Sequence, residues 1–287
     1  MGAPLSNGRH TVLVTGTTSG IGRETSRQLA RLGARVVMGV RDVERGHAIA
    51  RRIRDEGGSA EVLPLDLASF ASVRKAAARF TDAHPSLDAL VNNAGVALRR
   101  RRVSADGHEL TWQTNFLGGY LLTRLLLPAL RRATRPRIVN VSSEAHRTGR
   151  VAWDDLELSR GYGGFRAYAN TKLAQILFTR ELARREPEIA ANALHPGALA
   201  TRIWRDVPMI PMRAMILSVL WLAGSGMPSA ARGAKPVARL AWDPALEGVT
   251  GRYFRRFRET APSDAACDDA AAARLWEIAE RETGLAR

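Results

Sequence analysis

The feature that most restricts the fold of this chain is a regular alternation of two kinds of segment. Short apolar runs alternate with amphipathic segments of helical length. The apolar runs predict strands at Thr11–Thr15, Arg35–Val40, Ala60–Leu65, Leu87–Asn92, Arg137–Ser142, Ile189–Leu194 and Gly251–Phe254. The other segments predict helices at about Ile21–Leu32, Val43–Glu56, Phe70–Ala83, Gly107–Ala133, Phe165–Glu186 and Asp264–Thr283. Apolar strands that alternate with helices indicate an α/β fold: a doubly wound, mainly seven-stranded parallel sheet with helices on both faces.

No repeat or long linker interrupts the alternation, so we expect a single domain over residues 1–287. Ligands of doubly wound sheets bind beyond the carboxyl ends of the strands. Residues from about 198 to 243 follow the sixth predicted strand and are richer in Pro, Met and Trp. We expect this segment to form a substrate-binding lid, and residues 1–10 to be a flexible N-terminus.

The charge of the chain does not by itself indicate a nucleic-acid partner. The formal net charge is +15 at pH 7, and 40 of the 43 basic residues are arginine, because lysine occurs only at positions 75, 172 and 235. A nucleic-acid site gathers its basic residues on one face or along one helix, whereas these arginines are spread over the whole chain. We therefore attribute the charge to codon composition and expect no nucleic-acid partner.

Cysteine content and hydropathy bear on the location of the protein. Cys267 is the only cysteine, which excludes an internal disulfide and a cysteine-based zinc site, and we expect no metal. A reducing, cytoplasmic compartment fits best, and residues 1–10 lack the apolar core of a signal peptide. The most apolar stretch, Val207–Gly224, contains prolines and Arg213, and its uninterrupted part is too short to span a bilayer. Contact with a membrane surface or with another subunit stays open.

A glycine-rich turn, "TGTTSGIG" (residues 15–22), lies between the first predicted strand and the first predicted helix. Gly16 permits a tight turn, Gly20 lets the backbone approach a pyrophosphate, and Gly22 allows the helix to pack closely on the strand. The start of the helix offers N–H groups and a positive dipole end to phosphates. The position of the turn between strand and helix predicts a nucleotide site.

Five motifs, in the same order, resemble those of the short-chain dehydrogenase/reductase family. They are "TGTTSGIG", "NNAG" (92–95), "NVSS" (140–143), "YANTK" (168–172) and "HPG" (195–197). The resemblance runs from about Thr11 to the C-terminal "LWEIAERETG". The segments most similar to the retinol-dehydrogenase-like branch are "VRDVERG" (40–46), "RIVNVSSEAH" (137–146) and "KLAQILFTRELARR" (172–185). The resemblance implies a single-domain Rossmann fold, a nicotinamide cofactor and commonly a homo-oligomer.

The end of the second strand bears on the choice between NAD and NADP. In "VVMGVRD" Val40 occupies the place where the family usually has the acidic residue that binds the ribose of NAD, and Arg41 follows it. A guanidinium suits the 2′-phosphate of NADP and can stack on adenine, whereas Asp42 is expected to cap the next helix. We therefore favour NADP(H) over NAD(H); the alternative is that Arg41 is one surface arginine among 40.

The resemblance implies further cofactor contacts. Asp66 and the Leu67 backbone would hold the adenine, with a helix N-cap as an equal alternative for Asp66. Asn93 would approach the nicotinamide ribose, and Asn92 would join neighbouring strands. The complete set of expected cofactor contacts is Gly16, Thr18, Ser19, Gly20, Ile21, Gly22, Arg41, Asp66, Leu67, Asn93, Gly95, Tyr168, Lys172, Pro196, Gly197, Leu199 and Thr201.

Tyr168 and Lys172 form the expected catalytic pair. Residues four apart share one face of a helix, and Lys172 is a rare lysine in an arginine-rich chain. A free tyrosine has a pKa of about 10, and a nearby ammonium is expected to lower that pKa by favouring the phenolate. Tyr168 would then act as the general acid or base. The alternative is two side chains on an exposed helix face.

The resemblance completes this pair to a tetrad. Ser143 would hold and polarise the carbonyl oxygen of the substrate, with Ser142 packed below it. Asn115 would support a water-mediated proton relay to Lys172, with a helix-surface amide as its alternative. His195 is expected to have a structural role.

The sequence thus predicts an NADP(H)-dependent oxidoreductase that interconverts a ketone or aldehyde and an alcohol, with a carbonyl reductase favoured. The apolar segment Val207–Gly224 and the resemblance indicate a bulky hydrophobic substrate, such as a retinoid, steroid or polyketide. The alternatives are an NAD-linked alcohol dehydrogenase or an epimerase of the same family, and a catalytically silent NADP(H)-sensing regulator.

Overall fold

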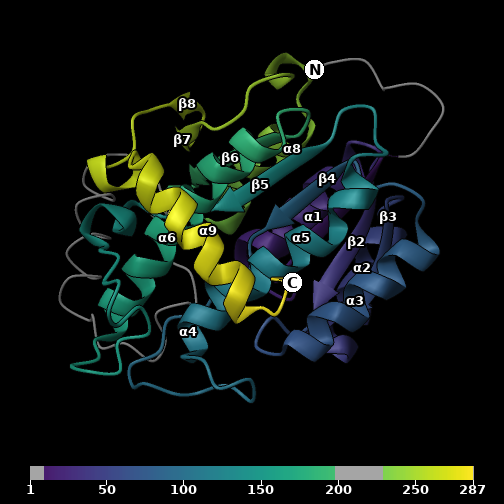
Figure 1. Cartoon of the computed structure of the whole chain (residues 1–287). Helices are drawn as coiled ribbons and strands as arrows, with labels where there is room; N and C mark the ends of the chain where they lie inside the picture. Colours follow the sequence, from purple (N-terminus) through teal and green to yellow (C-terminus); the bar gives the residue numbers. More distant parts are fainter. Residues whose placement is uncertain (1–9, 198–228, 287) are drawn as a thin grey trace, which may run out of the picture.

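A mainly parallel sheet forms the centre of the molecule (Figure 1). The computed structural model describes residues 10–197 and 229–286. Within these residues eight strands follow the order β3-β2-β1-β4-β5-β6-β7-β8. Their bounds are β1 Thr11–Thr15, β2 Arg35–Val40, β3 Ser59–Pro64, β4 Ala89–Asn92, β5 Arg137–Val141, β6 Ala190–His195, β7 Tyr253–Arg255 and β8 Arg258–Glu259. Strands β1 to β7 pair in parallel, as predicted, and the sequence missed only the short antiparallel β8.

Helices cover both faces of the sheet, which confirms the predicted single-domain α/β fold. One face carries α1 (Gly20–Arg31), α2 (Val43–Asp55) and α8 (Ala230–Trp242). The other carries α3 (Phe70–Ala83), α5 (Gly118–Leu130) and α6 (Gly164–Arg185), with α9 (Asp269–Glu282) packed on α6. Each face has its own apolar core, and the central strand β1 is buried along its whole length.

The helix predicted at Gly107–Ala133 is wrong in its start and its continuity. Gly107 lies in a turn with a φ of 91°, so the helical segment begins only with α4 (Leu110–Trp112). A π-helical segment, η1 (Gln113–Leu117), then separates α4 from α5. Wide π turns inside helices often occur at functional sites, and this one contains Asn115.

The predicted lid at about 198–243 extends too far. Residues 230–242 form α8, which Ser229 caps by accepting a hydrogen bond from the N–H of Arg232. Val237 and Leu240 of α8 are buried in the core beside α1. Pro236 lies inside this helix, and because proline usually ends a helix, the sequence did not predict α8. The rest of the predicted lid, 198–228, lies outside the described residues.

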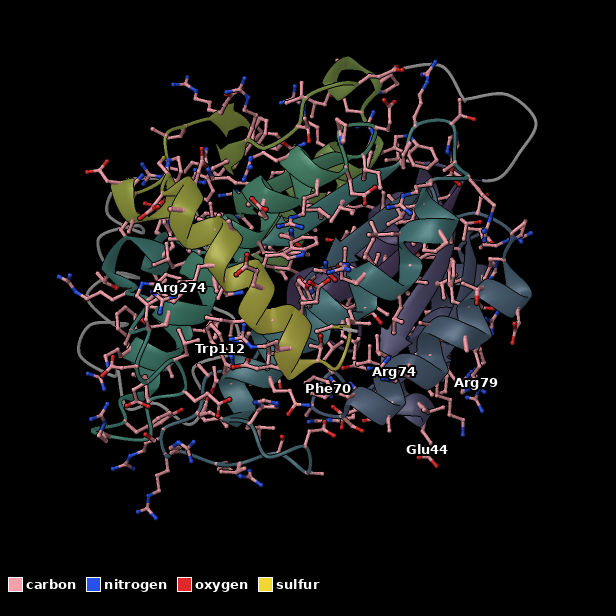
Figure 2. All side chains as sticks on the ribbon, in the orientation of Figure 1. Glu44, Phe70, Arg74, Arg79, Trp112 and Arg274 are labelled. Atoms are coloured by element: carbon pink, nitrogen blue, oxygen red, sulfur yellow. The ribbon has the colours of Figure 1, made fainter. Side chains whose placement is uncertain are left out.

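The two ends of the chain are tied to the fold where the structure describes them. Arg74 of α3 donates to the carbonyl of Thr283, and the indole of Trp112 donates to Glu282, so that both side chains hold the end of α9 (Figure 2). His10 pairs with Asp88 at 3.1 Å, whereas residues 1–9 of the predicted flexible N-terminus lie outside the described residues. None of the described helices is long and apolar enough to cross a membrane.

Candidate active site

The predicted site residues gather at the carboxyl edge of the sheet. Strand β1 lies between β2 and β4, so the direction of the strand order reverses there. Doubly wound sheets bind their ligands at this reversal. The loops after β1, β4 and β5 carry the glycine turn, Asn93 and Ser143, and α6 brings Tyr168 and Lys172 to the same edge.

The glycine turn has no room for side chains at two of its positions. Gly16 has a φ of 71°, and a Cβ there would lie 2.8 Å from the Cα of Ala94. A Cβ on Gly22 would lie 2.3 Å from the carbonyl oxygen of Gly16. Gly20 has a φ of 60°, and a Cβ there would meet no atom within 4 Å. Gly16 and Gly22 thus close the turn onto its neighbours, whereas Gly20 faces open space.

The start of α1 suits an anionic ligand. Ser19 occupies the N-cap position, but its side chain makes no capping hydrogen bond. The first turn of α1 contains no acidic residue, so no carboxylate on that turn offsets the positive end of the helix dipole. Together with the space above Gly20, these features fit the phosphates of a dinucleotide.

Thr15 and Asn93 connect the glycine turn to the loop after β4. The Thr15 hydroxyl accepts hydrogen bonds from the N–H groups of Asn93 and Ala94, each at 3.0 Å, and the Asn93 amide donates to the Thr15 carbonyl at 2.8 Å. The Asn93 side chain therefore fixes the turn, and its approach to a ribose stays a prediction. Asn92 donates to Asn140 of β5 at 2.9 Å, which confirms its predicted role between strands.

The alternative role of Asp66 as a helix cap is wrong. Ser69 caps α3 by accepting a hydrogen bond from the N–H of Ser72 at 3.3 Å. Asp66 instead accepts from the N–H of Ala68 at 3.0 Å, within the loop that follows β3. Contacts of Asp66 and the buried Leu67 with an adenine stay predictions.

Asp42 caps α2, as predicted, and accepts a hydrogen bond from the N–H of Arg45 at 3.0 Å. The carboxylate of Asp42 is thus turned toward the start of its own helix. Arg41, directly after β2, is exposed. A positive side chain at this position favours a cofactor with a 2′-phosphate.

Ser143 and Tyr168 are joined by a hydrogen bond between their side chains. Ser143 directly follows β5, and its hydroxyl also accepts from the N–H of Ala145 at 3.3 Å. Ser142 donates to the carbonyl of Lys172 at 2.8 Å, which confirms that Ser142 packs below the site. Tyr168 is 6% exposed, so the alternative of an exposed helix face is wrong.

Lys172 is also buried, and its amine has defined partners. Nζ donates to the carbonyl of Val141 at 2.8 Å and to the amide oxygen of Gln175 at 3.0 Å. It lies 5.3 Å from the centre of the Tyr168 ring. The pair expected at spacing four therefore faces one site from α6.

Burial moves the pKa values of this pair in opposite directions. Burial raises the pKa of Tyr168 to about 12, although the hydrogen bond to Ser143 acts to lower it. Burial lowers the pKa of Lys172 to about 7. The prediction that the tyrosine pKa is lowered is therefore wrong for the protein alone, because burial disfavours the phenolate more than the hydrogen bond to Ser143 favours it. Tyr168 keeps its proton at neutral pH, as a general acid requires.

Asn115 is buried and not the surface amide of the alternative interpretation. Its side chain accepts from the N–H of Val96 at 2.7 Å and donates to the Val96 carbonyl at 2.9 Å and to Thr171 at 3.1 Å. Its main-chain carbonyl accepts a hydrogen bond from Gln175 at 2.8 Å. The side chain of Asn115 thus holds the loop after β4, and the connection to Lys172 runs through its main chain. Its part in a proton relay stays a prediction.

The last group of predicted cofactor contacts follows β6. Gly197 has a φ of 109°, and a Cβ there would lie 3.0 Å from the guanidinium of Arg256. Pro196 is buried beside it. Leu199 and Thr201 lie outside the described residues. Contacts of Pro196 and Gly197 with a cofactor stay predictions.

His146 supports Ser143, and the sequence analysis missed it. Its Nε2 accepts from the N–H of Ser263 at 3.1 Å, so Nδ1 carries the hydrogen and donates to the Ser143 carbonyl at 2.7 Å. Burial lowers the pKa of His146, which favours this neutral form. The sequence feature that could have indicated this role is the position of His146, three residues after Ser143. The predicted structural role of His195 fits its burial, which lowers its pKa to about 4.

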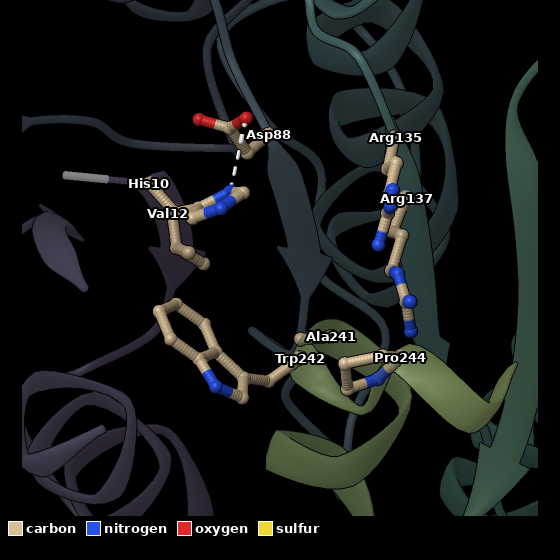
Figure 3. A pocket seen from close by; sticks show the side chains of 8 residues that line it. All are labelled: His10, Val12, Asp88, Arg135, Arg137, Ala241, Trp242 and Pro244. Carbon is tan, nitrogen blue, oxygen red and sulfur yellow. Dashed lines mark ion pairs between the residues drawn. The ribbon is translucent and has the colours of Figure 1, made fainter. Parts of the chain in front are cut away.

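Two further features of the described residues are a possible metal-binding cluster and a small pocket. His108, Glu157 and Glu282 have ligand-type atoms within 4.8 Å of one another, an arrangement that could hold a metal ion. Glu157 pairs there with His108 at 2.6 Å and with Arg101 at 3.7 Å, so a cation would compete with an arginine. A small pocket lies at the opposite, amino edge of the sheet (Figure 3). Its lining residues are His10, Val12, Asp88, Arg135, Arg137, Ala241, Trp242 and Pro244.

Comparison with known proteins decides the family. The family model of short chain dehydrogenases matches residues 10–209 of the chain. The protein is a short-chain dehydrogenase. The curated relatives of this short-chain dehydrogenase include retinol dehydrogenase 14 of Mus musculus, which is 39% identical over 96% of this chain and 86% of the relative. They also include polyprenol dehydrogenase of Mus musculus, with 42% identity over 95% of this chain and 83% of the relative. The predicted retinol-dehydrogenase-like branch is confirmed.

Solved structures show the same fold. A protein from Mycobacterium paratuberculosis matches with a TM-score of 0.77 and 35% identity, over 96% of this chain and 93% of that chain. The RhlG/NADP active-site complex of Pseudomonas aeruginosa matches with a TM-score of 0.69 and 27% identity, over 86% of this chain and 94% of that chain. The family model and the curated relatives identify the protein as an oxidoreductase that acts on alcohol or carbonyl groups.

The charge state of Lys172 can be measured directly. We expect one lysine signal of the cofactor-free protein, labelled with ¹³C at the lysine Cε, to titrate with a midpoint near pH 7, because burial lowers the pKa of Lys172 to about 7. The chain has only two other lysines, Lys75 and Lys235, and both are exposed. The Lys172→Arg variant should lack the titrating signal. Absence of any lysine signal that moves between about pH 6 and pH 8 would contradict this prediction.

Proposed function

We propose that this short-chain dehydrogenase is an NADP(H)-dependent oxidoreductase that interconverts a ketone or aldehyde and an alcohol, and that it works as a carbonyl reductase. The observation that carries the proposal is the grouping of the half-buried Ser143 with the buried Tyr168 and Lys172 at the carboxyl edge of the sheet. Ser143 offers a hydroxyl that can bind the substrate oxygen. Tyr168 offers a phenol that keeps its proton at neutral pH, and Lys172 offers an amine whose pKa lies near 7.

The glycine turn, the start of α1 and Arg41 would hold the cofactor, which supplies the hydride when it is bound. Ser143 would donate a hydrogen bond to the substrate oxygen and so polarise the carbonyl. Tyr168 would give its proton to the same oxygen as the alkoxide develops. Lys172 would then return a proton to Tyr168. In alcohol oxidation the same groups would act in the opposite sense.

A bulky hydrophobic substrate forms part of the proposal. The named relatives are a retinol dehydrogenase and a polyprenol dehydrogenase, whose names refer to long apolar alcohols. The apolar sequence of residues 207–224 supports the same class. We further propose a homo-oligomer in the cytoplasm, on the family resemblance and the single cysteine.

The test is NADPH consumption, measured beside NADH, with a panel of hydrophobic aldehydes and of aromatic and polycyclic ketones. Turnover that prefers NADPH supports the proposal. Binding of NADPH without turnover across the panel would favour the silent sensor of NADP(H), and binding of neither cofactor would overturn the proposal.

Replacement of Arg41 tests the cofactor preference. We expect Arg41→Ala to lower kcat/KM for NADPH by about 10- to 100-fold, because a hydrogen bond to a charged group contributes about 1.5–3 kcal/mol. The value for NADH should change little. The control is Arg51→Ala, which removes an exposed arginine of α2 on the same side of the sheet. An equal decrease of kcat/KM with NADPH and with NADH would show that Arg41 does not bind the 2′-phosphate.

A further inference from the structure

The chain of hydrogen bonds around Lys172 includes a residue that the proposed function does not use. Gln175 lies on α6, one turn after Lys172, and is 4% exposed. Its amide oxygen accepts from Nζ of Lys172 at 3.0 Å, and its amide nitrogen donates to the main-chain carbonyl of Asn115 at 2.8 Å. Gln175 therefore bridges the catalytic lysine and the π-helical segment η1.

This bridge determines which position around Nζ of Lys172 can gain or lose a hydrogen. An ammonium has three hydrogens, and an amine has two hydrogens and one lone pair. The carbonyl of Val141 and the amide oxygen of Gln175 accept two hydrogens from Nζ. Both acceptors can be satisfied in either state, so the third position is the one that alternates between hydrogen and lone pair. Nζ lies 5.3 Å from the centre of the Tyr168 ring, so the amine with this exchangeable position is a neighbour of the proposed general acid.

We propose that Gln175 is a positioning residue that, with the Val141 carbonyl, directs the exchangeable proton of Lys172 toward Tyr168. The inference rests on the proposed function and deepens it. When Tyr168 has given up its proton, an N–H bond of the Lys172 ammonium breaks and an O–H bond of the tyrosine forms again. The lysine becomes a neutral amine, still held by Val141 and Gln175, and regains its proton from solvent.

The orientation of Gln175 is itself fixed. The main-chain carbonyl of Asn115 accepts from the Gln175 amide nitrogen, so the amide oxygen must face Lys172. Nζ also contacts the Val141 carbonyl and lies over the ring of Tyr168, which is a titratable group. No charged side chain contributes to the shifted pKa of Lys172, whose cause is burial. A change of charge at position 175 should therefore shift the pKa of Lys172 directly.

The experiment measures the lysine signal of the cofactor-free protein and the steady-state kinetics side by side. We expect Gln175→Met, which keeps the length but removes the acceptor, to lower the midpoint of the Lys172 signal by at least about half a pH unit. Gln175→Glu should raise the midpoint by at least as much. Gln175→Met should lower kcat about 10-fold with little change in KM, because proton return and not binding is affected. Gln175→Asn, whose amide is one carbon shorter, should recover less than half of the loss.

The control is Gln113→Met, which removes another buried amide, one that bonds to Asp106 and not to Lys172. It should leave the lysine midpoint unchanged. Midpoints that stay unchanged in both Gln175→Met and Gln175→Glu would overturn the proposal, as would a kcat of Gln175→Met equal to that of the parent. The lysine titration needs neither substrate nor turnover, so it can succeed or fail independently of the oxidoreductase assay. If Gln175→Met does not fold, Gln175→Glu decides the question alone by the direction of its shift.

Discussion

Replacement of Tyr168 by phenylalanine is expected to reduce kcat by about 10²- to 10⁴-fold, the usual contribution of a general acid. The phenol is buried and holds its proton at neutral pH, because burial raises its pKa to about 12. Phenylalanine keeps the ring and its packing but has no proton to give. The affinity for NADPH should change little, because the glycine turn and the start of α1 are untouched.

The control for this variant is Tyr120→Phe. Tyr120 is also buried, and its hydroxyl contacts Arg124 and the main-chain carbonyl of Trp276 in α9. Its loss should affect stability and not kcat. The comparison is made by single-turnover NADPH oxidation together with NADPH binding. A Tyr168→Phe variant with parental turnover would remove Tyr168 from the reaction and would favour the sensor interpretation of the protein.

The sequence predicted the parts of the fold that depend on local patterns. Seven of the eight strands were identified; the inner strands β1, β2, β4, β5 and β6 are largely buried, and a strand buried on both faces has a continuous apolar sequence. Helix α8 was missed because Pro236 and an alanine-rich sequence disguise its apolar face. The π-helical segment at Gln113–Leu117 was also missed; one of its carbonyls, that of Asn115, accepts a hydrogen bond from Gln175 of α6, a contact between residues far apart in the sequence.

In the candidate site, too, the sequence predicted what depends on local spacing and missed what depends on contacts between distant residues. Spacing placed Tyr168 and Lys172 on one face of a helix, and the structure brings Tyr168 to Ser143 and Lys172 to the ring of Tyr168. The sequence could not reveal how burial changes their pKa values, because burial is a property of the whole fold. For the same reason it missed His146, whose partner Ser263 is 117 residues away.

Gly22→Ala is expected to weaken NADPH binding by at least about 100-fold, or about 2.7 kcal/mol. A Cβ at this position would lie 2.3 Å from the carbonyl oxygen of Gly16 and 2.4 Å from the amide nitrogen of Asn93. The first contact is with main chain and cannot be relieved by a rotamer change, so the glycine turn or α1 must move. Forcing an extra methyl group into such a site costs about 1–3 kcal/mol of stability. NADPH titration and thermal unfolding with and without NADPH measure the two effects.

A second glycine-to-alanine variant separates this clash from the general effect of a methyl group. Gly119 lies in α5, and a Cβ there would meet only the side chain of Asn92, at an ordinary contact of 3.8 Å. Gly119→Ala should therefore bind NADPH as the parent does and gain up to about 1 kcal/mol of stability, because alanine favours the helix. If Gly22→Ala binds NADPH as tightly as Gly119→Ala, the phosphates do not lie on the glycine turn. The NADP(H) site would then have to be sought at another place on the carboxyl edge of the sheet.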